Sequence, residues 1–394
     1  FRKATRGIGF LFTLMVASII AISSSQAQTY SVLYAFQDGF DGGQPSAGVT
    51  LDRAGNLYGT TTISGGSGGG TVYKLTQRNG SWTFGLLYNV GGTGSATIGP
   101  NGSLYIAGNN ENVFNLQPPA HFLPNFAGLW TATPLGPLPG PYDSCSGVVF
   151  DPNGNIYGTT LYYGLYADGT LYEISPSAGG WIETELYSFG NGADGALPYA
   201  GLLLDAAGNL YGTTSAGGAH GYGTVFELSY SAESGWTESV LYSFAGRDDG
   251  ANPYGGLIFD RAGNLYGATV GADGPGSGPS TVFKLTPSDG TWTLSTLYSF
   301  DNTSGEQCGP HGTPAMDSAG NLYDTTYCLG VHSNGSVFKL VPTSGGWAYS
   351  SLHDFDGDGA SPVAGVTLDA GGNIYGTTSS GGAHENGVVF EIMP

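Results

Sequence analysis

The sequence predicts an all-β fold: a seven-bladed β-propeller of four-stranded antiparallel blades, with the ring closed by the N-terminal strand. Three observations lead to this prediction. A segment close to GNLYGTT occurs seven times, and each repeat unit carries four short strand-like segments. The N-terminal segment also supplies a strand that the last unit lacks.

The copies of this segment set the period of the repeat. They are spaced 47 to 57 residues apart. A repeat of about fifty residues is typical of propellers and solenoids, so the unit itself has to distinguish the two. The copies begin at Gly55, Gly102, Gly154, Gly208, Gly263, Gly320 and Gly372.

The fourth unit predicts four strands and no helix. Ala200–Asp205 is apolar, and an AAGN turn separates it from a second strand, Leu210–Thr214. A Gly-rich loop leads to a third strand, Thr224–Leu228, and a turn ending in SGW leads to a fourth, Trp236–Phe244. Apolar residues follow no helical period in these segments. Four antiparallel strands per repeat predict a propeller blade.

The two ends of the chain predict how the ring closes. The seventh unit stops after its third strand, Val388–Ile392. The N-terminal segment Thr29–Phe36 reads TYSVLYAF, close to TESVLYSF at Thr237–Phe244, and would supply the missing fourth strand. A closed ring leaves no long unpaired sheet edge, whereas an open solenoid would need capping repeats.

Residues that recur from unit to unit are interpreted as packing or turn residues. Every Trp holds one position, at the start of the fourth strand, which predicts packing between blades. An Asp opens the D-x-x-G-N turn in six units, where its carboxylate would accept backbone N–H groups; a calcium loop is the alternative. The Trp residues are Trp82, Trp130, Trp181, Trp236, Trp292 and Trp347.

Residues 1–27 predict a signal peptide, which leaves residues 28–394 for the propeller. A head with three basic residues precedes an apolar run over residues 8–22, and small residues follow at Ser25 and Ala27. An uncleaved N-terminal anchor is the alternative. We expect a secreted or extracytoplasmic protein with no stable membrane insertion once the signal is removed.

Charge and cysteine content narrow the set of partners. The net charge of −20 argues against nucleic acid and anionic membranes as partners. Export permits disulfide bonds. Cys308 and Cys328 both fall in long loops of the sixth unit, so we expect them to pair and Cys145 to remain free. We expect the chain to be a monomer.

The pattern LYSF…DG…P…GLLLD..GNLYGTT..GG….GTVFEL resembles the GloVer tandem-repeat family of exported bacterial proteins, whose members carry different C-terminal anchors. The resemblance covers Thr29 to Ile392 and is strongest in units four to seven. It implies export and a repeat array; the family has no assigned catalytic residues, so the resemblance carries none over to this chain. The chain departs from anchored members by ending at Pro394 without a hydrophobic tail, so release is the expectation.

Loop lengths predict which face of the ring carries function. Two classes of long loop share one face: those joining the fourth strand to the next first strand, and those joining the second strand to the third. We call this the long-loop face. The opposite, short-turn face has the D-x-x-G-N and G-G-W turns. We expect a site on the long-loop face, near the mouth of the central channel.

Acidic residues precede five of the inner strands on the long-loop face. Most are followed by Gly, so they are turn-forming residues in one interpretation. The other is a partial ring of carboxylates that binds Ca²⁺ or a cationic ligand, with carbonyls and waters completing six to eight oxygens. The acids are Asp41, Asp194, Asp249, Glu306 and Asp358, of which the four Asp residues are the candidate Ca²⁺ ligands.

The residue that starts the inner strand varies between units, which is where a repeat protein can individualise a site. Tyrosines or a histidine hold this position in the adjacent units four, five and six. Their rings could pack on sugar C–H groups while nearby carboxylates accept sugar hydroxyls. Ordinary packing at the channel mouth is the alternative. The candidate ligand-binding residues are Tyr199, Tyr254, His311, Asp194, Asp249 and Glu306.

Three functions are consistent with these observations. No H-E-x-x-H or phosphate-binding loop motif is present. The leading hypothesis is therefore a non-enzymatic exported propeller that binds a glycan or protein ligand on its long-loop face. A secreted carbohydrate-active hydrolase or lyase is the first alternative, and it would need two carboxylates flanking the ligand. A structural surface repeat protein is the second.

Overall fold

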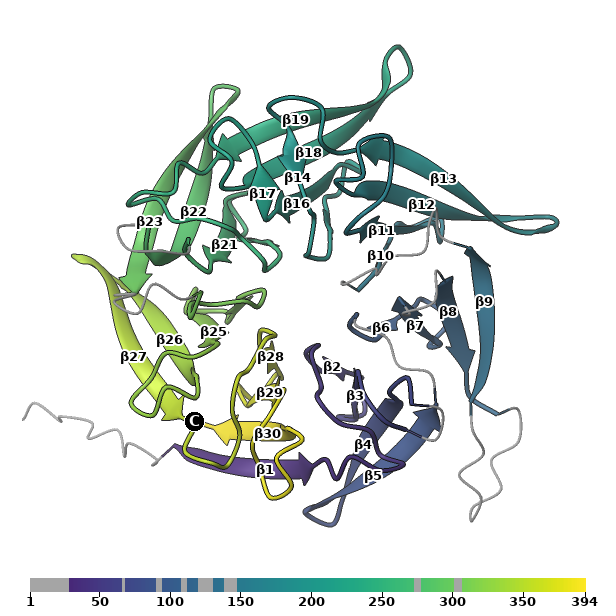
Figure 1. Ribbon diagram of the computed structural model, residues 1–394, viewed down its shortest axis with the longest axis vertical. Helices are drawn as coiled ribbons and strands as arrows, with labels where there is room; N and C mark the ends of the chain where they lie inside the picture. The colour runs from purple at the N-terminus through teal and green to yellow at the C-terminus, as the bar shows by residue number, and fades with distance from the viewer. Residues whose placement is uncertain are drawn as a thin grey trace, which may run out of the picture.

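The computed structural model confirms the seven-bladed propeller (Figure 1). Within the described part of the chain every regular element is a strand, and seven four-stranded sheets surround a central axis. No helix there is long and apolar enough to span a membrane. The proposed signal peptide lies outside the described residues. The structure describes residues 28–65, 68–89, 94–107, 112–119, 130–137, 147–272, 278–300 and 307–394.

Blades are numbered in chain order, and in each the strands run from the channel outward. Blade 1 contains β2 (Thr50–Leu51), β3 (Leu57–Thr60), β4 (Val72–Arg78) and β5 (Ser81–Tyr88). Blade 2 contains β6 (Thr97–Ile98), β7 (Leu104–Ala107), β8 (Asn112–Gln117) and β9 (Thr131–Pro137). Blade 3 contains β10 (Val149–Phe150), β11 (Ile156–Thr160), β12 (Thr170–Ser177) and β13 (Gly180–Ser188). Blade 4 contains β15 (Leu203–Leu204), β16 (Leu210–Thr214), β18 (Thr224–Ser231) and β19 (Gly235–Ser243).

The remaining blades repeat this order, and a small extra sheet joins two loops. Blade 5 contains β20 (Ile258–Phe259), β21 (Leu265–Thr269), β22 (Ser280–Ser288) and β23 (Thr291–Phe300). Blade 6 contains β24 (Ala315–Met316), β25 (Leu322–Thr326), β26 (Ser336–Thr343) and β27 (Gly346–Asp354). Blade 7 contains β28 (Thr367–Leu368), β29 (Ile374–Thr378), β30 (Val388–Met393) and β1 (Thr29–Ala35). The extra sheet pairs β14 (Gly195–Ala196) with β17 (Ala216–Gly217).

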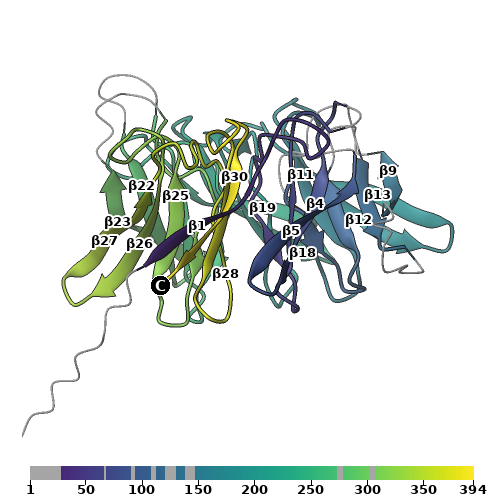
Figure 2. The ribbon, with the colours of Figure 1, turned by 90° about the horizontal axis from the view of Figure 1, so that it is seen from below.

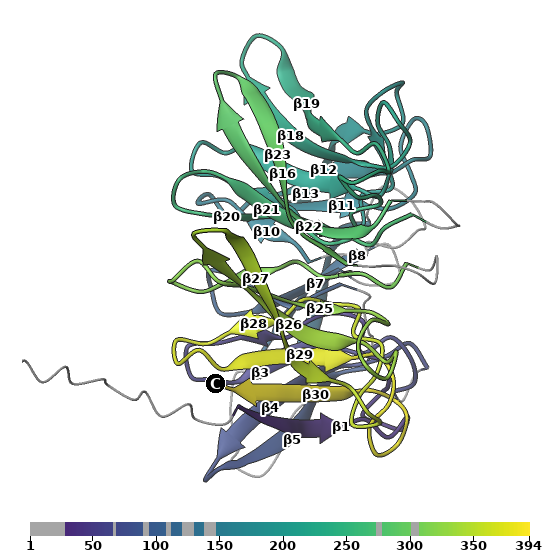
Figure 3. The same cartoon turned by 90° about the vertical axis from the view of Figure 1, so that its left-hand side faces the viewer.

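The predicted closure of the ring by the N-terminal strand is confirmed. β1 pairs antiparallel with β30, from Thr29 opposite Met393 to Ala35 opposite Val388. Figure 3 shows the two strands side by side at the outer edge of the ring. The Phe36 side chain that follows β1 is fully buried, so closure also contributes to the core.

The inner strands are shorter than the sequence predicted. In blade 4 only Leu203 and Leu204 pair with the second strand, opposite Tyr211 and Leu210. The residues before them line the channel instead. Small residues are required there, because a Cβ on Gly365 would lie 2.0 Å from the Thr313 carbonyl oxygen.

The recurring Trp residues pack between blades, as predicted. The Trp236 ring of blade 4 contacts the Tyr157 ring of blade 3, with centroids 6.3 Å apart. The Trp82 ring of blade 1 contacts Tyr375 of blade 7 in the same way, at 6.2 Å. These contacts link neighbouring blades that few backbone hydrogen bonds join.

The Asp of each D-x-x-G-N turn serves as a turn residue, the favoured interpretation. In blade 4 Asp205 Oδ1 accepts hydrogen bonds from the backbone N–H groups of Ala207 and Asn209, both at 2.8 Å. Its Oδ2 accepts from the Asn209 side chain and the Tyr211 hydroxyl. Both oxygens are engaged, and the described residues contain no cluster of three side chains able to hold a metal.

Candidate functional site

The candidate site lies where three inner strands of adjacent blades begin, at the long-loop mouth of the channel. Leu197 and Asn252 adopt left-handed backbone conformations, with φ of 58° and 55°, just before Pro198 and Pro253. Their N–H groups donate to carbonyls in the preceding blade's loop: Leu197 to Asp168 and Asn252 to Tyr222. These turns lead the chain toward the axis and set the direction of the next residue in each blade.

The structure brings together the three aromatic residues that the sequence singled out. The ring centroids of Tyr199 and Tyr254 are 4.8 Å apart, and those of Tyr254 and His311 are 5.4 Å apart. All three side chains are half-buried and line the central cavity. They form one curved wall drawn from blades 4, 5 and 6.

A fourth ring, which the sequence analysis missed, extends this wall. Tyr327 follows β25, and its ring centroid lies 4.9 Å from that of His311. Aligning the repeats could have found it, because the residue after the second strand is Tyr327 in blade 6 but Ser215 in blade 4. Four rings thus contact one another in sequence, of which Tyr199, Tyr254 and His311 line the cavity and Tyr327 packs against His311.

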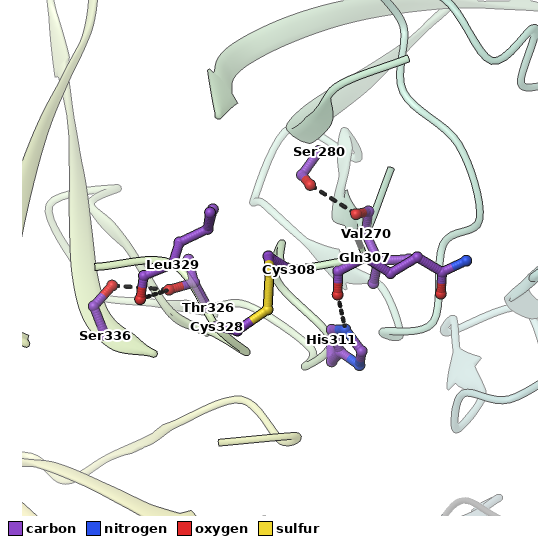
Figure 4. The surroundings of a disulfide bond; sticks show 9 residues. All are labelled: Val270, Ser280, Gln307, Cys308, His311, Thr326, Cys328, Leu329 and Ser336. Carbon is purple, nitrogen blue, oxygen red and sulfur yellow. Dashed lines mark hydrogen bonds between the residues drawn. A yellow bond between two sulfur atoms is a disulfide. The ribbon is translucent and has the colours of Figure 1, made fainter. Parts of the chain in front are cut away.

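The disulfide holds the His311 end of the wall in place. Cys308 and Cys328 are bonded across the two loops of blade 6, and Cys308 is buried (Figure 4). One His311 ring nitrogen, Nε2, lies 2.9 Å from the Gln307 carbonyl oxygen, next to this disulfide. Burial lowers the pKa of His311, with the Gln307 contact opposing the effect, so the ring is neutral at neutral pH. Cys145, expected to be free, lies outside the described residues.

The cavity enclosed by these residues has a volume of about 650 Å³. Opposite the aromatic wall it is bounded by small residues such as Ser46, Ala47 and Gly147. The described lining contains no Asp, Glu, Lys or Arg side chain. The described lining therefore offers ring faces, hydroxyls and backbone groups, but no formal charge.

The acids of blades 1, 4 and 5 belong to turns rather than to the cavity lining. Asp194 Oδ2 accepts a hydrogen bond from the Tyr187 hydroxyl at 2.8 Å. Asp249 Oδ2 accepts from the Tyr242 hydroxyl at 3.0 Å and from the Ala245 N–H at 2.7 Å. Burial, together with Asp249, raises the pKa of Tyr242 to about 12, so its hydroxyl stays a donor. Asp41 is engaged in the same way.

Asp358 has a different partner, and Glu306 lies outside the described residues. Asp358 Oδ2 is 2.9 Å from His353 Nε2, because His353 stands where other blades have the tyrosine. The His353 ring also stacks on Tyr30 of the closing strand, with centroids 3.7 Å apart. These contacts tie β27 and the connection that follows it to β1. The structure thus places the four candidate Ca²⁺ ligands in separate turns.

The chain shares its repeat with a known family. The Gloeobacter/Verrucomicrobia repeat matches residues 139–312 and 281–394. No curated protein shows significant similarity to the chain.

Solved structures share the fold at low sequence identity. The extracellular domain of a hybrid two-component system from B. thetaiotaomicron is 12% identical over 92% of this chain, with a TM-score of 0.57. A GH74 xyloglucanase from Xanthomonas campestris is 17% identical over 89% of this chain, with a TM-score of 0.54. This chain spans 39% of the first structure and 52% of the second. The Cps50 (Swd1) β-propeller domain of Myceliophteria thermophila is 10% identical, with coverage of 89% and 97% and a TM-score of 0.54.

Proposed function

The chain belongs to the Gloeobacter/Verrucomicrobia repeat family, and we propose that it is an exported propeller that binds a neutral glycan at the long-loop mouth of its channel. The observation that carries this proposal is a row of rings at the mouth: Tyr199, Tyr254 and His311 line a cavity whose described lining has no formal charge, and Tyr327 packs against His311. Export rests on the signal-peptide pattern of residues 1–27.

The aromatic wall suits a sugar because one face of a pyranose presents C–H groups that pack on aromatic rings. Successive centroids are 4.8, 5.4 and 4.9 Å apart and successive ring planes are inclined by 47°, 69° and 32°, so the rings touch but present several differently inclined faces. Tyr199, Tyr254 and His311 lie four residues before β15, β20 and β24, and Tyr327 directly follows β25, so each ring is anchored next to a strand of its blade. The surface is therefore formed before the ligand binds, which reduces the entropy cost of binding.

The size and charge of the cavity favour a short neutral segment of a glycan. A volume of about 650 Å³ lies in the usual range for small-ligand sites, about 300–1,000 Å³. The described part of the lining provides no cation to pair with an anionic sugar, and the net charge of −20 repels acidic polysaccharides at long range.

Binding accounts for the geometry better than hydrolysis does. A glycosidase needs two carboxylates about 5–10 Å apart across the bond it cleaves. Among the described residues the acids nearest the mouth in blades 4 and 5, Asp194 and Asp249, are held by tyrosine hydroxyls and backbone N–H groups. The cavity lining itself contains neither.

Calorimetric titration with neutral tetrasaccharides of glucose, xylose and mannose tests the proposal. Tyr254→Ala should weaken binding at least tenfold, because it removes the central ring of the wall. Tyr163→Ala is the matched control, since this exposed tyrosine also lies in a long loop but does not line the cavity. Equal affinity in wild type and Tyr254→Ala, or no binding of any member of the panel, would contradict the proposal.

A further inference from the structure

Blade 2 departs from the repeat at two positions on the short-turn side. Gly99 stands where six other units have the Asp that opens the turn. Asn115 stands on β8 where every other unit has a charged side chain. Those charged residues are Lys74, Glu173, Glu227, Lys284, Lys339 and Glu391.

A pocket of about 430 Å³ lies between blades 2 and 3 at these positions. It belongs to the short-turn side, because its residues come from the turns after the first and third strands and from the strands beside them. Three aromatic side chains and three amides contribute to its lining, and among the described residues no charged side chain does. These six residues are Tyr105, Phe150, Trp181, Asn101, Asn115 and Gln117.

The pocket contains a buried hydrogen-bond acceptor without a donor. Asn115 is only 7% exposed, and its Nδ2 donates to the Tyr105 hydroxyl oxygen at 2.9 Å. Asn115 Oδ1 has no hydrogen-bond partner among the described residues. A buried acceptor in this state is destabilising, so a ligand that donates to it would gain the full value of the bond.

The Tyr105 hydroxyl is the matching donor. In the regular blades the equivalent hydroxyl donates to the turn Asp, as Tyr266 does to Asp260 at 3.1 Å. Gly99 provides no carboxylate, and the Tyr105 ring lies so close that a Cβ on Gly99 would be 2.3 Å from Cε2. Tyr105 and Asn115 therefore present a donor and an acceptor side by side.

We propose that this pocket binds one or two residues of a neutral sugar, independently of the channel mouth. Trp181 and Phe150 supply ring faces for the sugar C–H groups, and Tyr105 with Asn115 can bond adjacent hydroxyls. The volume lies near the lower end of the usual range, about 300–1,000 Å³, which suits a short ligand. The absence of charge in the described lining selects against uronic acids.

The test is fluorine NMR on the full chain labelled with 5-fluorotryptophan. Trp181→Phe and Trp236→Phe variants assign two of the resonances. The probes are glucose, galactose, mannose, xylose and cellobiose, with glucuronate as the charged counterpart of glucose. We expect at least one neutral sugar to shift the Trp181 resonance saturably, with no shift of Trp236, which holds the same repeat position in blade 4.

Two variants separate this pocket from the channel mouth. Asn115→Lys introduces the residue that blades 1, 5 and 6 carry at this position, and should weaken binding at least tenfold. Asn101→Ala, at the exposed rim, provides a second variant, which removes an amide of the lining and also the acceptor of the Ser103 N–H in the turn; it should likewise weaken binding. Tyr254→Ala should leave the Trp181 shift unchanged.

Three outcomes would overturn the proposal. They are no saturable Trp181 shift with any neutral sugar, a shift retained in both pocket variants, or a shift lost only in Tyr254→Ala. A shift lost only in Tyr254→Ala would indicate that the sugar binds at the channel mouth, and it would leave the proposed function unchanged. Loss of binding in Tyr254→Ala calorimetry alone bears only on the channel mouth.

Discussion

Blades 4 and 6 have the same strand order and register, yet they differ in what surrounds the second strand. In blade 4 Gly212 lies opposite Phe226, whereas in blade 6 Asp324 lies opposite Phe338. Blade 6 also holds the disulfide and two rings of the channel wall, His311 and Tyr327. The residues common to both blades form the strands and their pairing. The residues that differ mark positions where blade 6 has additional contacts or a different function.

Where blade 6 has Asp324, five other blades have a glycine, and the absence of a side chain there makes room for an aromatic ring. In blades 1, 3, 4, 5 and 7 a Cβ at this position would lie 2.3 to 2.6 Å from the third-strand Tyr or Phe. Leu202 in blade 4 also crowds Gly212, and blade 6 has the shorter Pro314 in its place. Asp324 is 1% exposed, and its Oδ2 has no partner among the described residues. Burial raises the pKa of Asp324 to about 7, against an ordinary value of 3.8.

The largest expected effect comes from Asp324→Gly, which makes blade 6 resemble blade 4. Because the folded-state pKa is raised, the native protein binds more protons than the unfolded chain, and stability falls as pH rises from about 4 to about 7. Above pH 7 the difference between the two pKa values lowers the free energy of unfolding by about 4 kcal/mol. Asp324→Gly should therefore raise the free energy of unfolding by up to about 4 kcal/mol at pH 8 and far less at pH 4.

Urea denaturation of both proteins at the two pH values measures this difference. Gly212→Asp is the control in blade 4 and should destabilise at every pH, since Leu202 and Phe226 leave no space for the side chain. If the free energy of unfolding differs between wild type and Asp324→Gly by the same amount at pH 4 and pH 8, Asp324 does not titrate as described.

The second expected effect concerns the disulfide, which blade 4 does not have. Cys308 and Cys328 are 20 residues apart, so the bond restricts the unfolded chain and contributes about 3 kcal/mol. Reduction with a phosphine should lower the urea midpoint by a corresponding amount. The Cys308→Ser/Cys328→Ser protein should start at the lower midpoint and should not respond to the reductant. A midpoint that is insensitive to reduction would contradict this stabilising role.

The third effect should be equal in the two blades because it acts on a shared element. Asp205→Ala and Asp317→Ala each remove the carboxylate that accepts four hydrogen bonds in the turn. Each should cost about 2 kcal/mol, since several partly buried donors lose their acceptor at once. Thermal unfolding of the pair checks the equality. Losses that differ by a factor of two would show that neighbouring blades change the contribution of the turn.

The smallest effect concerns hydrogen bonds between adjacent blades. Thr213 Oγ1 donates to the Gly255 carbonyl oxygen at 2.9 Å, and Thr325 Oγ1 donates to that of Ala364 at 2.8 Å. Thr→Val at either site keeps the shape and removes the donor, for an expected loss of about 1 kcal/mol. Blade 5 has Ala268 at this position, so Ala268→Val is the control that removes no hydrogen bond. Losses no larger than that of the control would mean that the bonds contribute nothing measurable.

The strands and turns were predictable because the same pattern of apolar and turn-forming residues occurs in all seven repeat units. Leu210–Thr214 was predicted to the residue, and the pairing of the N-terminal strand followed from TYSVLYAF alone. The inner strands were predicted too long, since apolar character does not reveal where a strand leaves its neighbour to line a channel. Figure 2 shows the ring from its side, with the strands running between the two faces.

The sequence by itself determined the number of blades, their strand order, the closure of the ring and the equivalence of Tyr199, Tyr254 and His311. All of these depend on periodicity, which is a local property repeated along the chain. Only the tertiary structure decided that Asp194 and Asp249 bond to tyrosine hydroxyls, that Tyr327 joins the aromatic wall, and that blade 2 forms a pocket with blade 3. The direction of a side chain in an irregular loop depends on contacts with a neighbouring blade, and no period in the sequence encodes those contacts.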